Sequence, residues 1–313
     1  MLFLRYIAER IVSAIPVLLG VTIFVFVAIQ FVPGDPIRIM MHGRISDAEV
    51  AQIYAKLGMD RPLLVQYADF VRKALGGDLG LSIIQNTSVS KLVGEKLSPS
   101  LWLLVTSAVL SVLIAMPLAL LSARRRNRLT DHLIRVSSMV GFAMPPYWIG
   151  LLLMLLFGLK LGLFPISGFG KGPLDHLHHL FLPALTIACF LAPILVQSLR
   201  ASMLDVLAAE FIEVARAKGL SDWRILTKHV LRNALIPVIT VLAVNISWLV
   251  SGAVIVEYVF SLPGLGSLLV RSVGYRDYPV IQGLSLIFAV IVVAVNLLAD
   301  LSYMLVDPRV LRK

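Results

Sequence analysis

Six long apolar stretches divide this sequence, and polar segments separate them. A transmembrane helix needs about 20 predominantly apolar residues, and the pattern predicts six spans: Ile11–Val32, Leu101–Ala123, Val136–Leu159, Leu180–Leu199, Ala234–Val256 and Gln282–Val306. We therefore expect an all-α integral membrane protein with six transmembrane helices. The first stretch is long enough to span and no small-x-small cleavage pattern follows it, so we expect it to be retained.

The polar segment between the first two spans is predicted to form a small helical excursion. Ser46 and Glu49 have the spacing of a capping box, and Gly58 is a natural helix stop. A second helix is expected over Pro62–Leu75, with proline in its first turn and the pair Gly76-Gly77 after its end. The predicted regions are residues 1–99, a five-helix core over 100–306 that includes a loop at 200–232, and a tail at 307–313.

The third span contains the pair Pro145-Pro146, which must interrupt backbone hydrogen bonding inside the membrane. Such breaks persist where protein or a cavity satisfies the freed groups. A flexible break beside a transport path and a packed structural kink are both compatible with this sequence.

Composition and charge place the chain in a bilayer and orient it. Hydrophobic residues make up 58% and charged residues 15% of the sequence, and the mean hydropathy is +0.90. The termini and the loops 124–135 and 200–232 hold 16 of the 28 Lys and Arg residues, which predicts that both termini are cytoplasmic. The run Arg124–Arg128 is interpreted as a membrane anchor, since no aromatic residues interleave with it as in a nucleic-acid site.

The predicted span interiors hold no charged residue or histidine except Asp300 in the last one, which we assign a structural role. Ion-coupled carriers need intramembrane ionisable groups, so a secondary transporter is the weaker hypothesis. No phosphate-binding P-loop and no G-x-S-x-G or H-E-x-x-H motif occurs, so we expect no catalytic residue in this chain. The single Cys189 excludes an intrachain disulfide.

A histidine cluster precedes the fourth span. His176, His178 and His179 follow Asp175, a composition that raises the possibility of a metal site. A fourth convincing ligand is absent from the sequence nearby, and polar residues are normal at a membrane interface. We therefore predict no metal site.

The loop at 209–232 carries most of the functional information. Residues 209–218 have helical propensity, Gly219 is expected to stop the helix, and Ser221-Asp222 can cap a second one over about 223–231. Ala215 and Ala217 would keep the first helix slim enough to enter a groove, with the charges of Glu213, Arg216 and Lys218 at its rim. The alternative is an ordinary solvated amphipathic loop.

A polar stripe is predicted on the fifth span. Thr240, Ser247 and Ser251 lie within about 40° of one another on a helix of 3.6 residues per turn. The stripe could line a path for a hydrated solute, or it could supply the interhelical hydrogen bonds that Ser and Thr make in membranes.

Several stretches together resemble one family over nearly the whole chain. The segment Glu213-Val-Ala215-Arg-Ala-Lys-Gly219 resembles the EAA docking signature of ABC import permeases. Further matching stretches, similar to the oligopeptide, dipeptide and nickel branch, are Val32–Pro36, Gly77–Ser82, Leu182–Ala184, Arg200–Val206, Leu231–Pro237, Phe260–Gly266, Arg276–Gln282 and Asp307–Arg309.

The resemblance implies a type I ABC importer permease fold and an ATPase-docking site. Its docking residues would be Glu213, Ala215, Arg216, Ala217, Lys218, Gly219 and Asp222. Val214 stands where the broader pattern has its first alanine. Where the general signature continues with I-x-L-P, this chain reads His229-Val-Leu231-Arg232, so the end of the second helix is expected to differ from that in sugar importers.

The resemblance also implies the partners. They are a homologous second permease subunit, two cytoplasmic ATPase subunits or domains that carry ATP and Mg²⁺, an extracytoplasmic solute-binding protein, and the lipid bilayer. This chain itself is expected to bind no cofactor. The implied location is a bacterial or archaeal cytoplasmic membrane, and the implied substrates are di- or oligopeptides, with glutathione or nickel complexes as alternatives. Rival hypotheses are a stand-alone channel or carrier and a non-enzymatic assembly scaffold.

Overall fold

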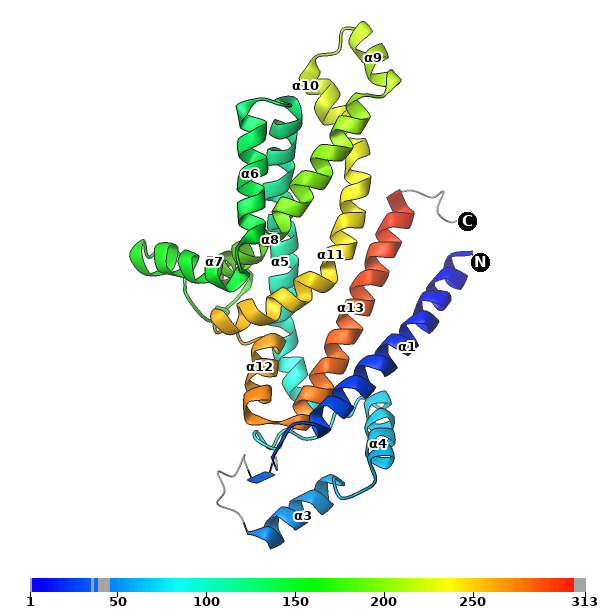
Figure 1. Ribbon diagram of the computed structural model, residues 1–313, viewed down its shortest axis with the longest axis vertical. Helices are drawn as coiled ribbons and strands as arrows, with labels where there is room; N and C mark the ends of the chain where they lie inside the picture. Colours follow the sequence, from blue (N-terminus) through cyan, green and yellow to red (C-terminus); the bar gives the residue numbers. More distant parts are fainter. Residues whose placement is uncertain (1, 35–36, 39–45, 307–313) are drawn as a thin grey trace. The chain divides into compact units, whose positions relative to one another are not determined.

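The computed structural model describes residues 2–34, 37–38 and 46–306, and most of these residues are helical (Figure 1). The β-pairing within this described part is an isolated bridge between Leu81 and Ser88, so the all-α prediction is confirmed. The chain divides into two compact units. Of the described residues, the first unit comprises those within Phe3–Ser100 and Pro263–Val293, and the second comprises Leu101–Leu262 and 294–306.

The first unit contains α1 (Leu2–Gln30), α3 (Asp47–Leu57), α4 (Leu63–Leu75), the start of α5 (Val89–Arg124), α12 (Leu265–Tyr275) and the start of α13 (Tyr278–Val306). The predicted capping box of α3 is present: Glu49 accepts a hydrogen bond from the backbone N–H of Ser46 at 3.0 Å. Gly58 ends α3 with a left-handed φ of 69°. Pro62 is the N-cap residue of α4, whereas the sequence had predicted it within the first turn of this helix.

Helix α4 packs on α1, as expected for an excursion too small for a large core of its own. The Tyr67 hydroxyl lies 3.0 Å from the Thr22 hydroxyl, and the Tyr67 ring meets the edge of Phe26 with centroids 5.5 Å apart. Thr22 is itself buried. An aromatic side chain with a polar tip thus joins the two helices by both apolar and hydrogen-bonding contacts.

A buried carboxylate closes the core of the first unit. Asp277 is 2% exposed and accepts hydrogen bonds from the Ser82 hydroxyl at 2.5 Å and from the backbone N–H of Ile83 at 3.2 Å. A Cβ atom at Gly283 would lie 2.8 Å from Val89 Cγ1, so glycine permits α13 to approach the start of α5. Two of the stretches that carry the family resemblance, Gly77–Ser82 and Arg276–Gln282, therefore meet in space.

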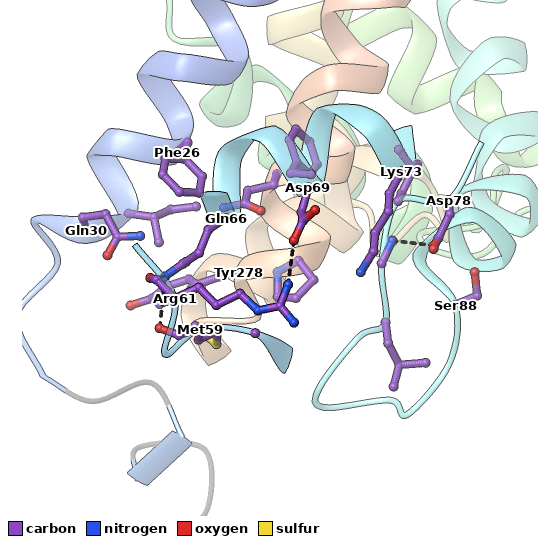
Figure 2. A pocket seen from close by; sticks show the side chains of 18 of the residues that line it. Phe26, Gln30, Met59, Arg61, Gln66, Asp69, Lys73, Asp78, Ser88 and Tyr278 are labelled. Carbon is purple, nitrogen blue, oxygen red and sulfur yellow. Dashed lines mark hydrogen bonds and ion pairs between the residues drawn. The ribbon is translucent and has the colours of Figure 1, made fainter. Parts of the chain in front are cut away.

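A cavity of about 500 Å³ lies within the first unit, between the end of α1, the α3–α4 pair and the start of α13 (Figure 2). Its polar wall includes Arg61, whose Nη1 lies 3.0 Å from Asp69 Oδ2, and the Gln66 amide, which donates to the carbonyl of Arg61 at 2.7 Å. Lys73 and Asp78 also line it. Both signs of charge face the cavity, so it is a mixed polar hollow rather than an ion-selective one.

Helix α12 is absent from the sequence-based expectations. It spans Leu265–Tyr275, begins after Gly264 and ends at Arg276, which has a left-handed φ of 56°. Its residues Leu265 and Leu268 are buried in the core of the first unit. The helix is short and amphipathic. It was not predicted because it lies outside the six long apolar runs from which the helices were inferred.

The second unit contains the rest of α5 together with α6 (Leu129–Ala143), α7 (Pro146–Leu153), the π-helical segment η1 (Met154–Lys160), α8 (Pro173–Leu207), α9 (Glu210–Ala217), α10 (Asp222–Arg224), the π-helical segment η2 (Ile225–Val230) and α11 (Leu231–Val259). Helix α8 is central, since α6, α7 and α11 all pack on it. Small residues make this possible: a Cβ at Gly150 would meet Phe260 at 3.0 Å and Thr186 at 3.3 Å.

The predicted spans lie in helices. The helices end at other residues than the predicted spans do, and the third span is sharply bent. Within the described residues, four helices are long and apolar enough to cross a membrane: α1 from Ile7, α5, α8 and α13 to Leu301. The predicted third span Val136–Leu159, with its break at Pro145-Pro146, falls within a helix pair, Leu129–Ala143 and Pro146–Lys160, that is bent by 103°. Helix α11 covers the predicted fifth span, and its segment Trp248–Val259 is a shorter apolar helix.

Charged residues also lie in the parts of the helices that extend beyond the predicted spans. Because α6 begins at Leu129 and α8 continues to Leu207, Asp131 and Arg200 lie inside helices, beyond the ends of the predicted spans. Glu257 is 2% exposed in the last turn of α11. Asp300 is half-buried in α13 and makes an interaction there. Charges near helix ends had been counted as loop residues because apolar windows end before helices do.

Candidate coupling site

The loop between α8 and α11 folds into a helical hairpin. Helix α9 spans Glu210–Ala217, and Gly219 reverses the chain with a φ of 76°. Its backbone N–H donates to the carbonyl of Arg216 at 2.9 Å, and that of Leu220 donates to the carbonyl of Ala215 at 3.3 Å. Left-handed backbone is far easier for glycine than for other residues. The predicted first helix and its glycine stop are therefore confirmed.

The second predicted helix is longer than expected. Ser221 occupies the N-cap position of α10 without a capping side-chain hydrogen bond, and the chain stays helical through η2 into α11. The expected end near Leu231 is wrong. With no proline before Pro237, nothing in this stretch forces the helix to stop.

One face of the hairpin packs on the protein itself. Ile212 and Ala215 of α9 are 0% and 8% exposed, and Ile225 and Val230 of η2 are 1% and 0% exposed. All four belong to the core of the second unit, together with Met203 of α8. Ala215 therefore packs closely within the chain's own core.

The opposite face is exposed. Glu213, Arg216, Ala217, Lys218, Gly219 and Asp222 all lie there. Arg216 and Asp222 form a long ion pair of 3.9 Å across the bend between α9 and α10. Sequence analysis missed three exposed apolar side chains on the same hairpin: Phe211, Val214 and Trp223, at 48%, 55% and 56% exposed. Phe211 and Val214 could have been found from the sequence, because they are apolar and do not share the i, i+3 face of α9 that Ile212 and Ala215 form.

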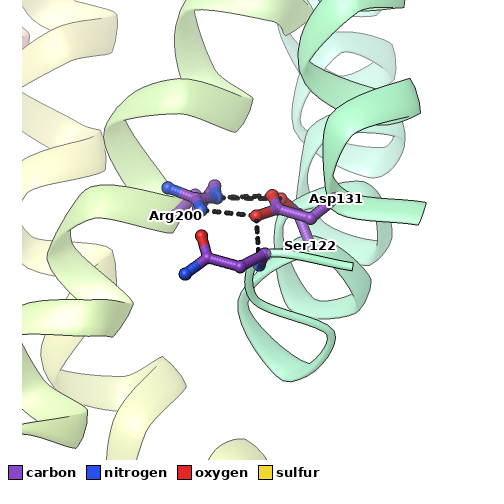
Figure 3. A network of polar contacts seen from close by, with 4 residues as sticks. Ser122, Asp131 and Arg200 are labelled. Carbon is purple, nitrogen blue, oxygen red and sulfur yellow. Dashed lines mark hydrogen bonds and ion pairs between the residues drawn. The ribbon is translucent and has the colours of Figure 1, made fainter. Parts of the chain in front are cut away.

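A buried ion pair joins α8 to α6, in the part of α8 that precedes the hairpin (Figure 3). Arg200 of α8 holds Asp131 of α6 in a fork: Nη2 to Oδ2 at 2.7 Å and Nε to Oδ1 at 2.8 Å. The Ser122 hydroxyl at the end of α5 donates to the same carboxylate at 2.5 Å, and the backbone N–H of Asn127 donates at 2.9 Å. Asp131 is fully buried. Four donors, from α8, from α5 and from the linker after α5, thus converge on one carboxylate carried by α6.

The proline pair forms the sharp bend. Pro145 is the N-cap and Pro146 the first residue of α7, directly after the end of α6. Pro146 also lines a small apolar cleft of about 30 Å³, together with Phe190 of α8 and Trp248 of α11. The rings of Phe142, Phe190 and Trp248 stack in series at 5.0 and 5.2 Å. The predicted break in the helix is confirmed, and aromatic side chains pack beside it.

The polar stripe on α11 is only partly described. The side chains of Thr240 and Ser247 lie outside the described part of the chain, and Ser251 is exposed and makes an interaction. The choice between a path lining and interhelical hydrogen bonding stays open here.

The histidine cluster separates into two parts. His176 stacks on Phe169 with centroids 3.8 Å apart and pairs with its carbonyl oxygen at 2.7 Å. Asp175, His178 and His179 instead gather, with one potential ligand atom of each within 4.8 Å of the others.

Comparisons with known proteins agree with this architecture. The sequence matches the family described as "Binding-protein-dependent transport system inner membrane component" over residues 115–312, and the N-terminal family of such membrane components over residues 3–101. Among solved structures, the MetNI methionine ABC transporter in an inward-facing conformation matches with a TM-score of 0.57 and 16% identity, covering 69% of this chain and 96% of that one. That likeness concerns the fold.

Three relatives that match over nearly their whole length are closer in sequence. The oligopeptide transport system permease protein AppB of Bacillus subtilis (strain 168) is 42% identical over 311 residues, which covers 97% of this chain and 98% of the relative. The glutathione transport system permease protein GsiC of Salmonella typhimurium is 38% identical over 308 residues, covering 98% and 99%. The GsiC of Escherichia coli (strain K12) is 37% identical over the same length.

Several apolar helices of spanning length, together with the family matches, define this chain as a membrane permease. More specifically, this chain belongs to the family of binding-protein-dependent transport system inner membrane components, the permeases of ABC importers.

Proposed function

We propose that this chain is one of two permease subunits of an ATP-driven importer for di- or oligopeptides, and that the α9–α10 hairpin docks on a cytoplasmic ATPase. The observation that carries the proposal is the two-sided hairpin. Its Ile212 and Ala215 are buried in the chain's own core, while Phe211, Val214 and Glu213 face outward. An apolar patch rimmed by charge is typical of a protein interface.

In this proposal the chain crosses the membrane six times with both termini in the cytoplasm, and the α3–α4 segment lies outside. The bent pair α6–α7 and helix α11 would complete the crossings beside the four long helices. The excess of Lys and Arg in the termini and in the loops 124–135 and 200–232 supports this orientation. The partners would be a homologous second permease, two ATPase subunits that bind ATP and Mg²⁺, and a solute-binding protein.

The proposed coupling depends on a rigid link from the hairpin to the membrane helices. Arg200 lies in α8, whose end leads directly into α9, and the Arg200–Asp131 fork ties α8 to α6. A pull on the hairpin would then move α8 and α6 together. ATP must bind the outward-facing arrangement more tightly than the inward-facing one for its binding to shift the equilibrium.

The relatives support a peptide substrate. One is named an oligopeptide permease and another a glutathione permease, and glutathione is itself a small peptide. Glutathione is therefore the nearest alternative, and nickel complexes remain a further one. Thr240, Ser247, Ser251, Pro145 and Pro146 are the residues proposed to border the path.

The docking proposal is tested by photocrosslinking in native vesicles. A photoreactive amino acid at Val214, which is exposed and lies opposite the buried face of α9, is expected to capture an ATPase subunit. A matched probe at Arg126, exposed in the loop between α5 and α6, serves as the control. Capture from both positions alike, or from neither, contradicts docking through this hairpin.

Transport gives the second measurement. Glu213→Ala is expected to lower peptide uptake and substrate-stimulated ATP hydrolysis without changing the amount of inserted protein, because Glu213 is exposed. Asp205→Ala, another exposed acid in the last turns of α8, is the matched control. Peptide flux through the purified chain alone in liposomes would instead establish a stand-alone channel or carrier.

A further inference from the structure

The start of α8 brings three metal-binding side chains onto one helical face. Asp175, His178 and His179 occupy positions i, i+3 and i+4, which are neighbours on a helix surface. One potential ligand atom of each lies within 4.8 Å of the others. His178 is exposed, and the other two are half-buried, so a solvated ion has direct access.

Hydrogen bonds to carbonyl groups fix both imidazoles in tautomers that leave a nitrogen lone pair. His178 Nε2 lies 3.0 Å from the carbonyl oxygen of Leu163, and His179 Nδ1 lies 3.0 Å from that of Asp175. A carbonyl oxygen only accepts, so these nitrogens must donate. The neutral rings then present Nδ1 of His178 and Nε2 of His179 as acceptors. Metal-ligating histidines almost always donate their other ring N–H in this way.

The carboxylate is held in a similar manner. The backbone N–H of Lys171 donates to Asp175 Oδ2 at 2.6 Å, and Oδ1 lies 3.2 Å from His179 Nδ1. The loop that supplies this N–H approaches closely because Gly170 has no side chain: a Cβ there would lie 2.5 Å from Asp175 Oδ2. The loop and the first turns of α8 therefore form one packed cluster.

His176 lies outside the group of three. Its ring stacks on Phe169 with centroids 3.8 Å apart, which commits it to packing. The same short stretch of sequence thus contains two histidines positioned as ligands and a third that is committed to packing.

We propose that Asp175, His178 and His179 form a Zn²⁺ site on the first turns of α8. Imidazole and carboxylate are established zinc ligands, and three protein ligands with water in the fourth position complete a tetrahedral ion. The sequence-based expectation of no metal rested on the missing fourth ligand, which water supplies. At Zn–N and Zn–O distances of about 2.0–2.2 Å, ligand atoms lie closer than 4.8 Å to one another, so binding requires the side chains to shift, and His179, whose Nδ1 faces Asp175, must turn its Nε2 toward the ion. The exposed His178 has the side-chain freedom to do so.

The test uses the full chain in lipid nanodiscs, purified without a polyhistidine tag and stripped of metal. Zn²⁺ is titrated in competition with a chromophoric chelator. We expect one high-affinity ion per chain, and at least a tenfold loss of affinity in His178→Ala and in His179→Ala. His176→Ala is the matched control and is expected to bind as the wild type does. Zinc X-ray absorption is expected to report nitrogen and oxygen ligands without sulfur.

Two results would overturn the site. One is unchanged zinc affinity in both His178→Ala and His179→Ala. The other is an equal loss in His176→Ala, which would indicate nonspecific binding to the histidine stretch. His178→Ala keeps the test interpretable because His178 is exposed, so its folded yield is expected to match the wild type. Peptide uptake is not used as the readout, so failure here leaves the proposed transport function unaffected.

Discussion

Removing the Asp131 carboxylate is expected to destabilise the second unit strongly. In Asp131→Ala, the Arg200 guanidinium loses the carboxylate that accepts from its Nε and Nη2 and keeps only the Ser122 hydroxyl, 3.0 Å from Nε, as an acceptor. The Arg200 side chain is only 16% exposed. The Ser122 hydroxyl and the Asn127 N–H lose their acceptor as well. Breaking a buried pair from one side costs about 3–5 kcal/mol. Because Arg200 retains some contact with water, we expect a value near the lower end, about 3 kcal/mol.

The assay is thermal unfolding of the purified chain in detergent or nanodiscs. For a unit of this size, each kcal/mol lowers the midpoint by about 2–4 °C, so the expected drop is roughly 6–12 °C. Arg126→Ala is the control, since it removes an exposed cation from the same loop and is expected to change stability by less than about 0.5 kcal/mol. The double variant Asp131→Leu with Arg200→Met is expected to be more stable than Asp131→Ala, because no charge is left buried and unpaired.

Two outcomes would refute this reasoning. If the midpoint of Asp131→Ala equals that of Arg126→Ala, the pair contributes nothing to folding. The second concerns the double variant. If its loss of stability equals the sum of the losses in Asp131→Leu and in Arg200→Met, the stability is lost through packing and not through an unpaired charge.

Three further predictions concern the first unit. Asp277→Ala is expected to cost more stability than Ser82→Ala, about 2–4 against 1–2 kcal/mol, because it also strips acceptors from backbone N–H groups; equal midpoints would contradict this. Gly283→Ala is expected to cost about 1–3 kcal/mol by overpacking, since its Cβ would lie within 3.2 Å of two core side chains, and an unchanged melting curve would oppose it. The pKa of Glu49 is lowered, chiefly by the backbone N–H of Ser46 and then by its hydroxyl. The cap therefore stabilises α3 above the unfolded carboxyl pKa and fades as pH falls through the lower folded pKa; corrected amide exchange in α3 that is equally slow at pH 3 and pH 7 would contradict it.

Local patterns in the sequence predicted much of the fold. Long apolar runs located the helices, because a backbone in hydrocarbon must satisfy its own hydrogen bonds. The capping box at Ser46, the stops at Gly58 and Gly219, and the break at Pro145 were also predictable, since each depends on residues a few positions apart. For the candidate coupling site, the position of the hairpin was predictable, and its buried face was not.

What remained hidden depends on residues far apart in the chain. Ser82 and Asp277 are separated by 195 positions, and Arg200 and Asp131 by 69. No periodicity links such pairs, so each residue had seemed an ordinary polar residue outside a span. The side-chain contacts of α9 likewise decided that Ala215 faces the chain's own core.

The sequence by itself therefore determined the class of fold, the approximate positions of the helices and the family, because length, hydropathy and short motifs are local properties. Only the tertiary structure decided which charges are buried together, how sharply the chain bends at Pro146, and that His176 packs on Phe169 while His178 and His179 gather with Asp175. These features depend on close packing of distant segments and on side-chain direction. Neither is encoded in the order of residues along a single helix.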